Sequence, residues 1–262
     1  MMTKTKKSRD GILPITVKRF GSTDENTFIR GFTYCSNETF FLLSMDSIKE
    51  YTIDLHTHSI TSYDGGINAK QFEQILTNHI LDFVAITDHN QTHFAEEMHK
   101  KFGEKIIVGE EIMTTEGEII GLFLTNAIPS GGTAQETIES IHQQGGLVYI
   151  PHPFETIRKG VSQEVLQKIS KQIDIMEVFN ARAFLQRKSA DAYSFASKHA
   201  LPMAASSDAH GVRGLGSAYT TISGIPTAKT LTELLHNGSR KTKNAPLYTL
   251  LYPTVNKIKR RL

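Results

Sequence analysis

The chain has 262 residues, of which 39% are hydrophobic and 21% charged, and its formal net charge is +2. This length is enough to bury one large core, and the composition is that of an ordinary globular protein. No segment approaches the roughly 20 apolar residues of a membrane-spanning helix, and the basic N-terminus is not followed by the apolar stretch of a signal peptide.

The charge is unevenly distributed. Residues 1–9 contain four basic and no acidic residues, and residues 239–262 contain seven basic and no acidic residues. The remaining 18 basic residues accompany all 27 acidic ones, so residues 10–238 carry a net charge of about −9. An acidic body suits cation binding, and the basic ends are either solvated tails or contacts for nucleic acid or anionic lipid. The one cysteine, Cys35, excludes an intramolecular disulfide and predicts a cytoplasmic location.

Residues 1–50 are expected to form an N-terminal extension with a β-hairpin, whose strands at 27–34 and 38–44 are separated by a turn at 35–37. From Tyr51 onward, strands alternate with helices. Strands are predicted at 51–57, 82–87, 105–110, 118–124, 146–150, 174–179 and 202–206. Helices are predicted at 69–80, 92–102, 133–144, 162–171, 183–199 and 227–237. Two of these helices begin with capping boxes, Asn68 with Gln71 and Thr133 with Glu136.

Seven strands alternating with helices imply an α/β fold with a mainly parallel sheet, either closed as a barrel or wound open. Strands 105–110 and 118–124 have no helix between them, so a barrel would be irregular. The alternating pattern covers residues 51–238, and residues 239–262 form a basic C-terminal segment.

His56 and His58 follow the first of these strands. Side chains two residues apart in an extended segment point to the same side, so both imidazoles can approach one point. Such a pair also arises by chance, and its meaning depends on whether other strands end in similar residues.

Nearly every predicted strand does end in His, Asp, Glu or Asn. In parallel α/β folds these ends form one face, where binding sites are built. The residues concerned are Asp88, His89, Glu110, Glu111, His152, Asn180, Asp208 and His210. The other six histidines fall in predicted helices and are interpreted as structural: His79, His93, His99, His142, His199 and His236. Imidazoles and carboxylates without cysteines indicate two or three Zn, Mn or Fe ions.

With these residues the sequence resembles the polymerase and histidinol phosphatase (PHP) family of metal-dependent phosphoesterases, whose fold is a distorted seven-stranded β/α barrel. The resemblance spans about 51–235. It rests on segments at 56–59, 87–89, 109–112, 151–154, 177–180 and 207–210, which in this order and spacing are highly specific together.

The resemblance implies three ligand sets. His56, His58, Glu111 and Asp208 would hold a first ion, and Glu111 would bridge to a second ion held by His152. Asp64, His89 and His210 would hold a third. Many members have a histidine where this chain has Glu118, so Glu118 either replaces that ligand or leaves the second ion more weakly held.

Further residues are candidates around these ions. Asp208 is the expected proton acceptor from the attacking oxygen, and Arg182 and Arg213 are the cations best placed for the phosphate, although both are also interpretable as exposed structural arginines. Asp88 and Asn180 either orient neighbouring ligands or cap strand ends.

These features predict a metal-dependent phosphoesterase that hydrolyses a small phosphorylated substrate, such as a nucleotide, a short oligonucleotide or another phosphomonoester, by attack of a metal-activated hydroxide. A second interpretation is a 3'-5' exonuclease-type nuclease acting on DNA or RNA, with 252–262 as a basic helix at nucleic acid or membrane. A third is a non-catalytic domain stabilised by metal, against which the intact ligand set argues.

Overall fold

The computed structural model describes residues 49–183, 186 and 188–262, together with four short strands nearer the N-terminus. The chain divides into two compact units, Met1–Glu50 and Tyr51–Leu262. Among the described residues, no helix is long and apolar enough to cross a membrane.

The N-terminal unit contains two antiparallel strand pairs. β1 (Arg19–Gly21) pairs with β2 (Phe28–Arg30), and β3 (Tyr34–Ser36) pairs with β4 (Thr39–Phe41). Cys35 therefore lies in a strand opposite Phe40 and not in the turn where the sequence placed it. The rest of the predicted hairpin strands lies outside the described residues.

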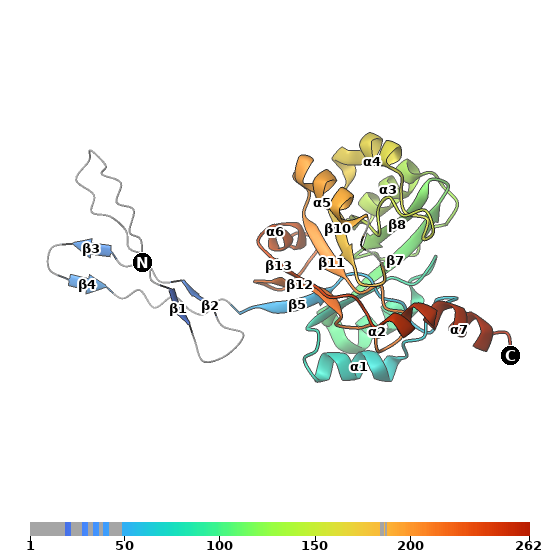
Figure 1. Cartoon of the computed structure of the whole chain (residues 1–262), viewed down its shortest axis with the longest axis horizontal. Helices are drawn as coiled ribbons and strands as arrows, with labels where there is room; N and C mark the ends of the chain where they lie inside the picture. The colour runs from blue at the N-terminus through green and yellow to red at the C-terminus, as the bar shows by residue number, and fades with distance from the viewer. Residues whose placement is uncertain are drawn as a thin grey trace. The chain divides into compact units, whose positions relative to one another are not determined.

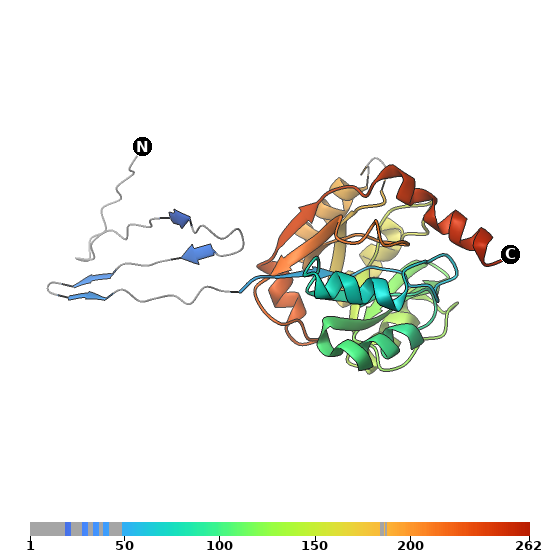
Figure 2. The same ribbon diagram turned by 90° about the horizontal axis from the view of Figure 1, so that it is seen from below.

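The second unit is built on a single mixed sheet surrounded by helices (Figures 1 and 2). The strands of this sheet are β5 (Tyr51–Asp54), β6 (Phe83–Ile86), β7 (Ile106–Thr114), β8 (Gly117–Leu122), β9 (Leu147–Ile150), β10 (Ile175–Asn180), β11 (Met203–Ser206), β12 (Ala218–Ile222) and β13 (Ser239–Thr242). Their order is β11-β10-β9-β8-β7-β6-β5-β12-β13.

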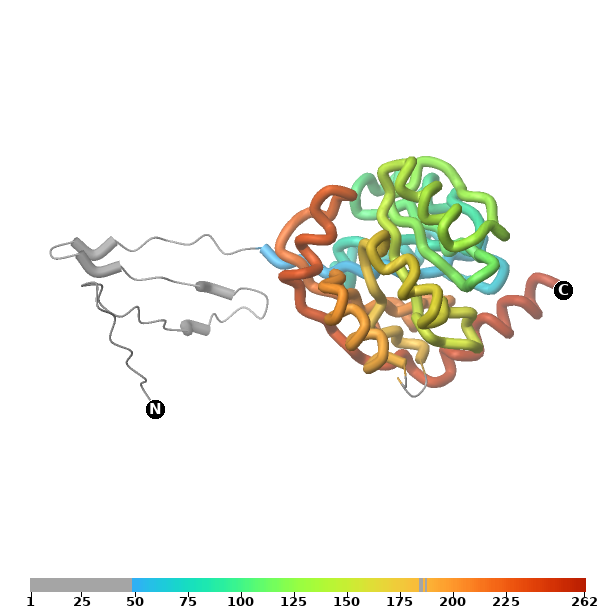
Figure 3. Tube along the Cα trace, turned by 90° about the horizontal axis from the view of Figure 1, so that it is seen from above, coloured from blue at the N-terminus to red at the C-terminus, as the bar shows by residue number. Residues whose placement is uncertain are grey.

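Seven α-helices are described in this unit. They are α1 (Ala69–Thr77), α2 (His93–Phe102), α3 (Ala134–Gln143), α4 (Gln163–Ile169), α5 (Ser189–Lys198), α6 (Leu231–His236) and α7 (Tyr252–Lys259). Three short 3-10 helices accompany them, η1 (Gly103–Lys105), η2 (Ser170–Gln172) and η3 (Leu247–Leu251). Both predicted capping boxes are confirmed, at the starts of α1 and α3. The tube in Figure 3 shows α7, drawn in red, at one end of the unit.

The expected α/β sheet with helices outside is confirmed, but the described sheet has nine strands and not seven. The two strands that the sequence analysis missed are β12 and β13. β13 is an exposed polar edge strand, and in β12 the buried position between Ala218 and Ile222 is Thr220, so neither has a strong apolar pattern. The irregularity expected between 105–110 and 118–124 is an antiparallel pairing of β7 with β8.

The sheet nearly closes into a barrel because β11 returns to the side of β5 and β12. Thr220 Oγ1 accepts a hydrogen bond from the Ala205 N–H at 3.0 Å, and Asp54 Oδ1 accepts one from the Ser207 N–H at 3.1 Å. Just beyond both strands, the His58 N–H donates to the Ala209 carbonyl at 2.9 Å. These bonds form a seam that joins the ends of β5 and β11.

Two large apolar clusters fix this arrangement. One includes side chains from β5 to β12 and contains Leu231 and Leu235 of α6. The other lies between the sheet and helices α1 to α5. Burial on both faces leaves the strand ends as the place where polar side chains collect, which is the expected position of a site in such a fold.

Candidate metal centre

The predicted convergence of strand ends takes place at one rim of the barrel. Nine imidazole and carboxylate side chains form four overlapping groups, within each of which the ligand atoms lie within 4.8 Å of one another. These residues are His56, His58, Asp64, His89, Glu111, Glu118, His152, Asp208 and His210. The set contains all nine ligands expected from the sequence, and each of these side chains is at least nine-tenths buried.

Two carboxylates lie close to both His56 and His58. His56 Nε2 and His58 Nε2 lie 3.1 Å apart. Glu111 Oε2 lies 3.5 and 3.2 Å from these two nitrogens, and Asp208 Oδ1 lies 3.6 and 3.5 Å from them. Two nitrogens and two carboxylate oxygens at these separations provide the donor set of a first-row divalent cation.

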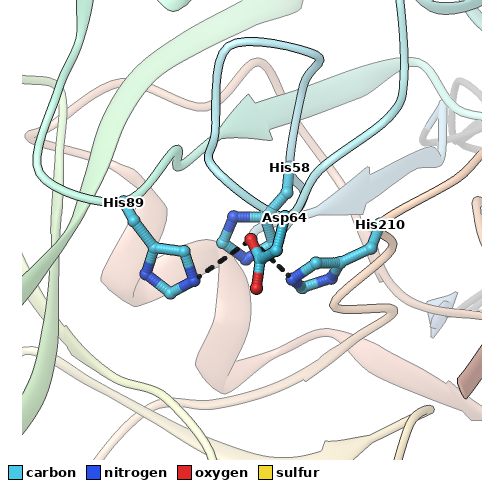
Figure 4. Close-up of side chains that lie close together, drawn as sticks. All are labelled: His58, Asp64, His89 and His210. Carbon is cyan, nitrogen blue, oxygen red and sulfur yellow. Dashed lines mark ion pairs between the residues drawn. The ribbon is translucent and has the colours of Figure 1, made fainter. Parts of the chain in front are cut away.

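A second group is formed by His58, Asp64, His89 and His210 (Figure 4). Asp64 Oδ1 lies 3.6 Å from His89 Nε2 and 3.4 Å from His210 Nε2, as the dashed lines in the figure mark. The loop after β5 brings Asp64 to this position, while His89 follows β6 and His210 follows β11. His58 belongs to both groups, so the two candidate ion positions are neighbours.

Glu111 lies close to four of the five histidines in this set. Besides His56 and His58, its carboxylate lies 3.3 Å from His89 Nδ1 and 3.0 Å from His152 Nε2. A carboxylate with its two oxygens directed at different imidazoles is suited to bridging two ions.

Bound metal ions would satisfy the polar groups of this site better than hydrogen bonds within the protein do. His89 Nδ1, which lies 3.3 Å from Glu111 Oε2 and 3.7 Å from Glu118 Oε1, is buried and has no hydrogen-bond partner among the described residues. In addition, burial and the charges of Glu111 and Asp208 raise the pKa of Glu118 to about 9. Carboxylates packed this closely repel one another, and divalent cations relieve that repulsion.

Glu118 lies at the edge of this set. Its oxygens are 3.7 Å from His89 Nδ1 and 3.7 Å from His152 Nε2, and it forms a group with His89 and Glu111. The structure therefore brings Glu118 close to the other candidate ligands, as the expected replacement of a histidine ligand would require.

Replacing Glu118 with glutamine is expected to weaken the binding of one ion by at least about tenfold, because it removes a negative oxygen donor. Elemental analysis of protein dialysed against a limiting metal concentration measures this change. Glu116→Gln is the matched control, since Glu116 is in the same β7–β8 hairpin and accepts a hydrogen bond from the Ala134 N–H outside the site. Equal metal contents in both variants would show that Glu118 is not a ligand.

Behind the ligands lies Glu177, to which the sequence analysis gave no role of its own. Its buried carboxylate accepts hydrogen bonds from the Tyr149 hydroxyl at 3.0 Å and from Asn180 Nδ2 at 3.1 Å. It also accepts from the His152 N–H and lies 3.3 Å from His56 Nδ1. A carboxylate on the second nitrogen of a ligating histidine fixes the tautomer that leaves Nε2 free for metal.

The other two supporting candidates have different roles. Asp88 accepts hydrogen bonds from the Ser59 N–H at 2.6 Å, from the Ser59 hydroxyl and from the Thr61 hydroxyl at 2.7 Å, so it organises the loop after β5 and does not orient an imidazole. Asn180 Nδ2 donates to Asp208 Oδ2 at 3.2 Å as well as to Glu177. Asn180 therefore connects the candidate ligand Asp208 to the Glu177 carboxylate.

Two arginines contact Asp208. Arg182 Nη1 donates to Asp208 Oδ1 at 3.0 Å, and Arg158 Nη1 donates to Asp208 Oδ2 at 3.0 Å. Although burial raises the pKa of Asp208, the charges of Arg182 and His56 hold it well below its usual range. Sequence reasoning missed Arg158, which lies in a loop after His152 without a periodic signal. Arg213, which the sequence proposed for the phosphate, is exposed and does not line the cavity.

The ligands open into a cavity of about 240 Å³. Its wall includes Tyr63, Arg158, Lys159 and Arg182, and two residues of α7, Pro253 and Lys257. The six histidines interpreted as structural belong to none of the ligand groups found among the described residues. His99, for example, has its Nδ1 2.7 Å from the Ile106 carbonyl oxygen.

Two of the candidate ligands have a left-handed backbone conformation. His152 and Asp208 have positive φ angles of 27° and 51°. His152 is two residues beyond the end of β9 and Asp208 is two residues beyond the end of β11, and both belong to the candidate ligand groups. Backbone conformations of this kind persist where the surrounding structure imposes them, and they concentrate at functional sites.

The fold is shared with solved structures of low sequence identity. A two-domain protein from Bacteroides vulgatus that contains a predicted PHP-like metal-dependent phosphoesterase matches with a TM-score of 0.61 at 17% identity, over 80% of this chain and 70% of that chain. The lesion-specific endonuclease PfuEndoQ from Pyrococcus furiosus matches with a TM-score of 0.50 at 14% identity, over 73% and 57%. The barrel and its rim of ligands define the class: this is a PHP-like metal-dependent phosphoesterase fold.

Two sequence relatives come from one archaeon, and both are uncharacterized proteins. The uncharacterized protein MJ0417 of Methanocaldococcus jannaschii is 35% identical over 180 residues, which are 65% of this chain and 70% of the relative. MJ1587 of the same organism is 47% identical over 104 residues, so that 38% of this chain matches 59% of that protein's length. A family model described as PHP-associated matches residues 187–239. The chain belongs to the polymerase and histidinol phosphatase family.

Proposed function

We propose that this protein hydrolyses a small phosphorylated substrate, such as a nucleotide, a short oligonucleotide or another phosphomonoester, with two or three divalent ions held at the rim of the barrel. The observation that carries the proposal is the buried set of nine ligands beside two guanidinium groups. Ligands alone would suit a structural metal, but arginines at the same cavity also suit a substrate with phosphate oxygens.

Each residue has a defined task in this proposal. His56, His58, Glu111 and Asp208 hold the first ion, Glu111 and His152 the second together with Glu118, and Asp64, His89 and His210 the third. Bound divalent ions at such a site activate a water molecule and neutralise phosphate oxygens. Zn, Mn and Fe all match a donor set of imidazoles and carboxylates.

Asp208 is proposed to orient the attacking water by accepting its hydrogen bond, and to take its proton during attack on phosphorus. The positive charges of Arg158 and Arg182 keep this carboxylate ionised and therefore able to accept. Arg182 and Arg158 also line the cavity. Arg158 is already hydrogen-bonded to Glu155, Asn180 and Asp208, so Arg182 is the arginine proposed to contact a phosphate oxygen. Arg213 has no part in this arrangement because it lies outside the cavity wall.

A nuclease that acts on DNA or RNA is the second candidate. It is supported by the fold likeness to an endonuclease and by the basic residues of the C-terminal segment. Neutralisation of several phosphates by basic residues makes binding strongly salt-dependent, whereas hydrolysis of a small ester depends on salt only weakly.

A phosphate-release screen tests the proposal. The full-length protein, loaded with Mn or Zn, is incubated with aryl phosphate, nucleotides, sugar phosphates, histidinol phosphate and short RNAs. We expect turnover of at least one class, loss of turnover after chelation and its return on adding metal, with Arg213→Ala matching the unmodified protein. Absence of turnover across the panel in metal-loaded protein would overturn the enzymatic proposal, and activity on strands alone would favour the nuclease.

A further inference from the structure

The C-terminal helix α7 contacts two loops that carry candidate metal ligands. Asn256 Nδ2 donates one hydrogen bond to the Asp64 carbonyl and another to the His210 carbonyl, each at 2.9 Å. Asp64 and Asn256 are 192 residues apart in the sequence. Because a side-chain amide carries two hydrogens, this one group can tie both loops together.

Two glycines in these loops leave space for the helix. A Cβ atom at Gly66 would lie 2.8 Å from Asn256 Nδ2, and a Cβ atom at Gly211 would lie 2.6 Å from the ring of Tyr252. Neither glycine has a φ in the left-handed region, so close packing against α7 explains the missing side chains better than backbone conformation does. The loops that follow Asp64 and His210 therefore pack closely against α7 at positions where a side chain would collide with it.

The same helix directs a cation at the cavity. Lys257 Nζ lies 3.8 Å from Asp64 Oδ2 and 4.6 Å from the centre of the Tyr63 ring. Its side chain is 44% exposed, and it lines the cavity together with Pro253. Lys259, two residues further on, is exposed and absent from the cavity wall.

We propose that α7 is a wall of the active site, in which Asn256 is a positioning residue for the Asp64 and His210 loops and Lys257 binds a phosphate group of the substrate. The role of Lys257 rests on the proposed function. The role of Asn256 does not, because it concerns only the geometry of two metal ligands. Part of the basic C-terminal segment therefore faces inward, and the segment is not simply a solvated tail.

The positioning role is tested with Asn256→Leu, which keeps the side-chain size but removes both donors. We expect protein loaded with Mn and dialysed to retain fewer ions per chain, through loss of the ion at Asp64, His89 and His210. Gly211→Ala displaces the helix from the opposite loop and should give the same loss. Asn237→Leu is the control, since Asn237 Nδ2 donates to the Glu233 carbonyl at the end of α6, outside the site.

Metal content is measured by elemental analysis, and far-UV circular dichroism shows that each variant is folded. Unchanged metal content in folded Asn256→Leu and Gly211→Ala would overturn the positioning role. This readout needs no substrate, so it stands even where the phosphate-release screen finds no activity. If the unmodified protein shows no turnover in the screen while these variants lose metal, only the proposed function is overturned.

The role of Lys257 is tested with inorganic phosphate as the probe, titrated calorimetrically into metal-loaded protein. Lys257→Ala should weaken phosphate binding by about fivefold, as for a partly exposed charge pair, and Lys257→Arg should restore it. Lys259→Ala should bind phosphate as the unmodified protein does. Equal binding by Lys257→Ala and the unmodified protein, or an equal loss in Lys259→Ala, would overturn a specific contact.

Discussion

Asp208→Asn is expected to reduce phosphoesterase turnover by at least about 100-fold, because Asp208 is proposed both as a metal ligand and as the acceptor of the water proton. The substitution keeps the shape of the side chain and removes its charge. Asparagine also tolerates the left-handed backbone conformation of this position, where φ is 51°, at least as well as aspartate does. The variant should therefore stay folded, so a loss of activity reports on the carboxylate.

Steady-state kinetics on the best substrate of the screen, together with metal content, measure this effect. The control is Asp191→Asn, the same change in an exposed residue of α5 that pairs with Lys188 at 3.2 Å. We expect this control to be indistinguishable from the unmodified protein. Full activity of Asp208→Asn with its normal complement of metal would exclude Asp208 from the chemistry.

Glu177→Gln is expected to lower metal affinity by about 10–100-fold, although Glu177 is not itself among the ligand groups. The Glu177 carboxylate accepts from three donors and lies beside His56 Nδ1. A glutamine places an N–H₂ group among donors, which leaves buried hydrogens without an acceptor at a cost of about 1–3 kcal/mol. His56 then loses the partner that directs its Nε2 to the metal.

Competition with a chromophoric chelator measures the affinity, and thermal unfolding measures the stability. Tyr149→Phe is the matched variant, since it removes one donor and leaves the carboxylate in place. Its metal affinity should change much less than that of Glu177→Gln. If the two variants behave alike, the hydrogen-bond network and not the charge of Glu177 supports the site.

The candidate site was largely predictable because parallel strands place their ends at one rim. A hydrophobic strand followed by a residue that can bind metal is recognisable in the sequence, as at His56, His89, His152 and Asp208. Asp64 and Glu118 were assigned through the family resemblance, since one lies in a loop and the other in a strand antiparallel to its neighbours. All six nevertheless belong to the same set of groups.

Features that depend on three-dimensional packing were not predictable. Strand β13 has no apolar residues, so only its pairing with β12 identifies it. Arg158 contacts Asp208 from a loop, and the sequence of a loop has no hydrophobic periodicity from which its conformation could be predicted. The inward face of α7 is determined by Asn256 and Tyr252, whose partners lie far away in the sequence.

The seam of the barrel has a consequence for how the protein fluctuates. His56 and His58 lie on one side of it and Asp208 and His210 on the other, and the His58 N–H donates across it to Ala209. Ions bound there would connect both sides of the seam. Local opening of the barrel at the seam would then require the ions to dissociate. The exchange of the His58 amide hydrogen with solvent would then slow as the site fills, and metal occupancy would set how often the barrel opens.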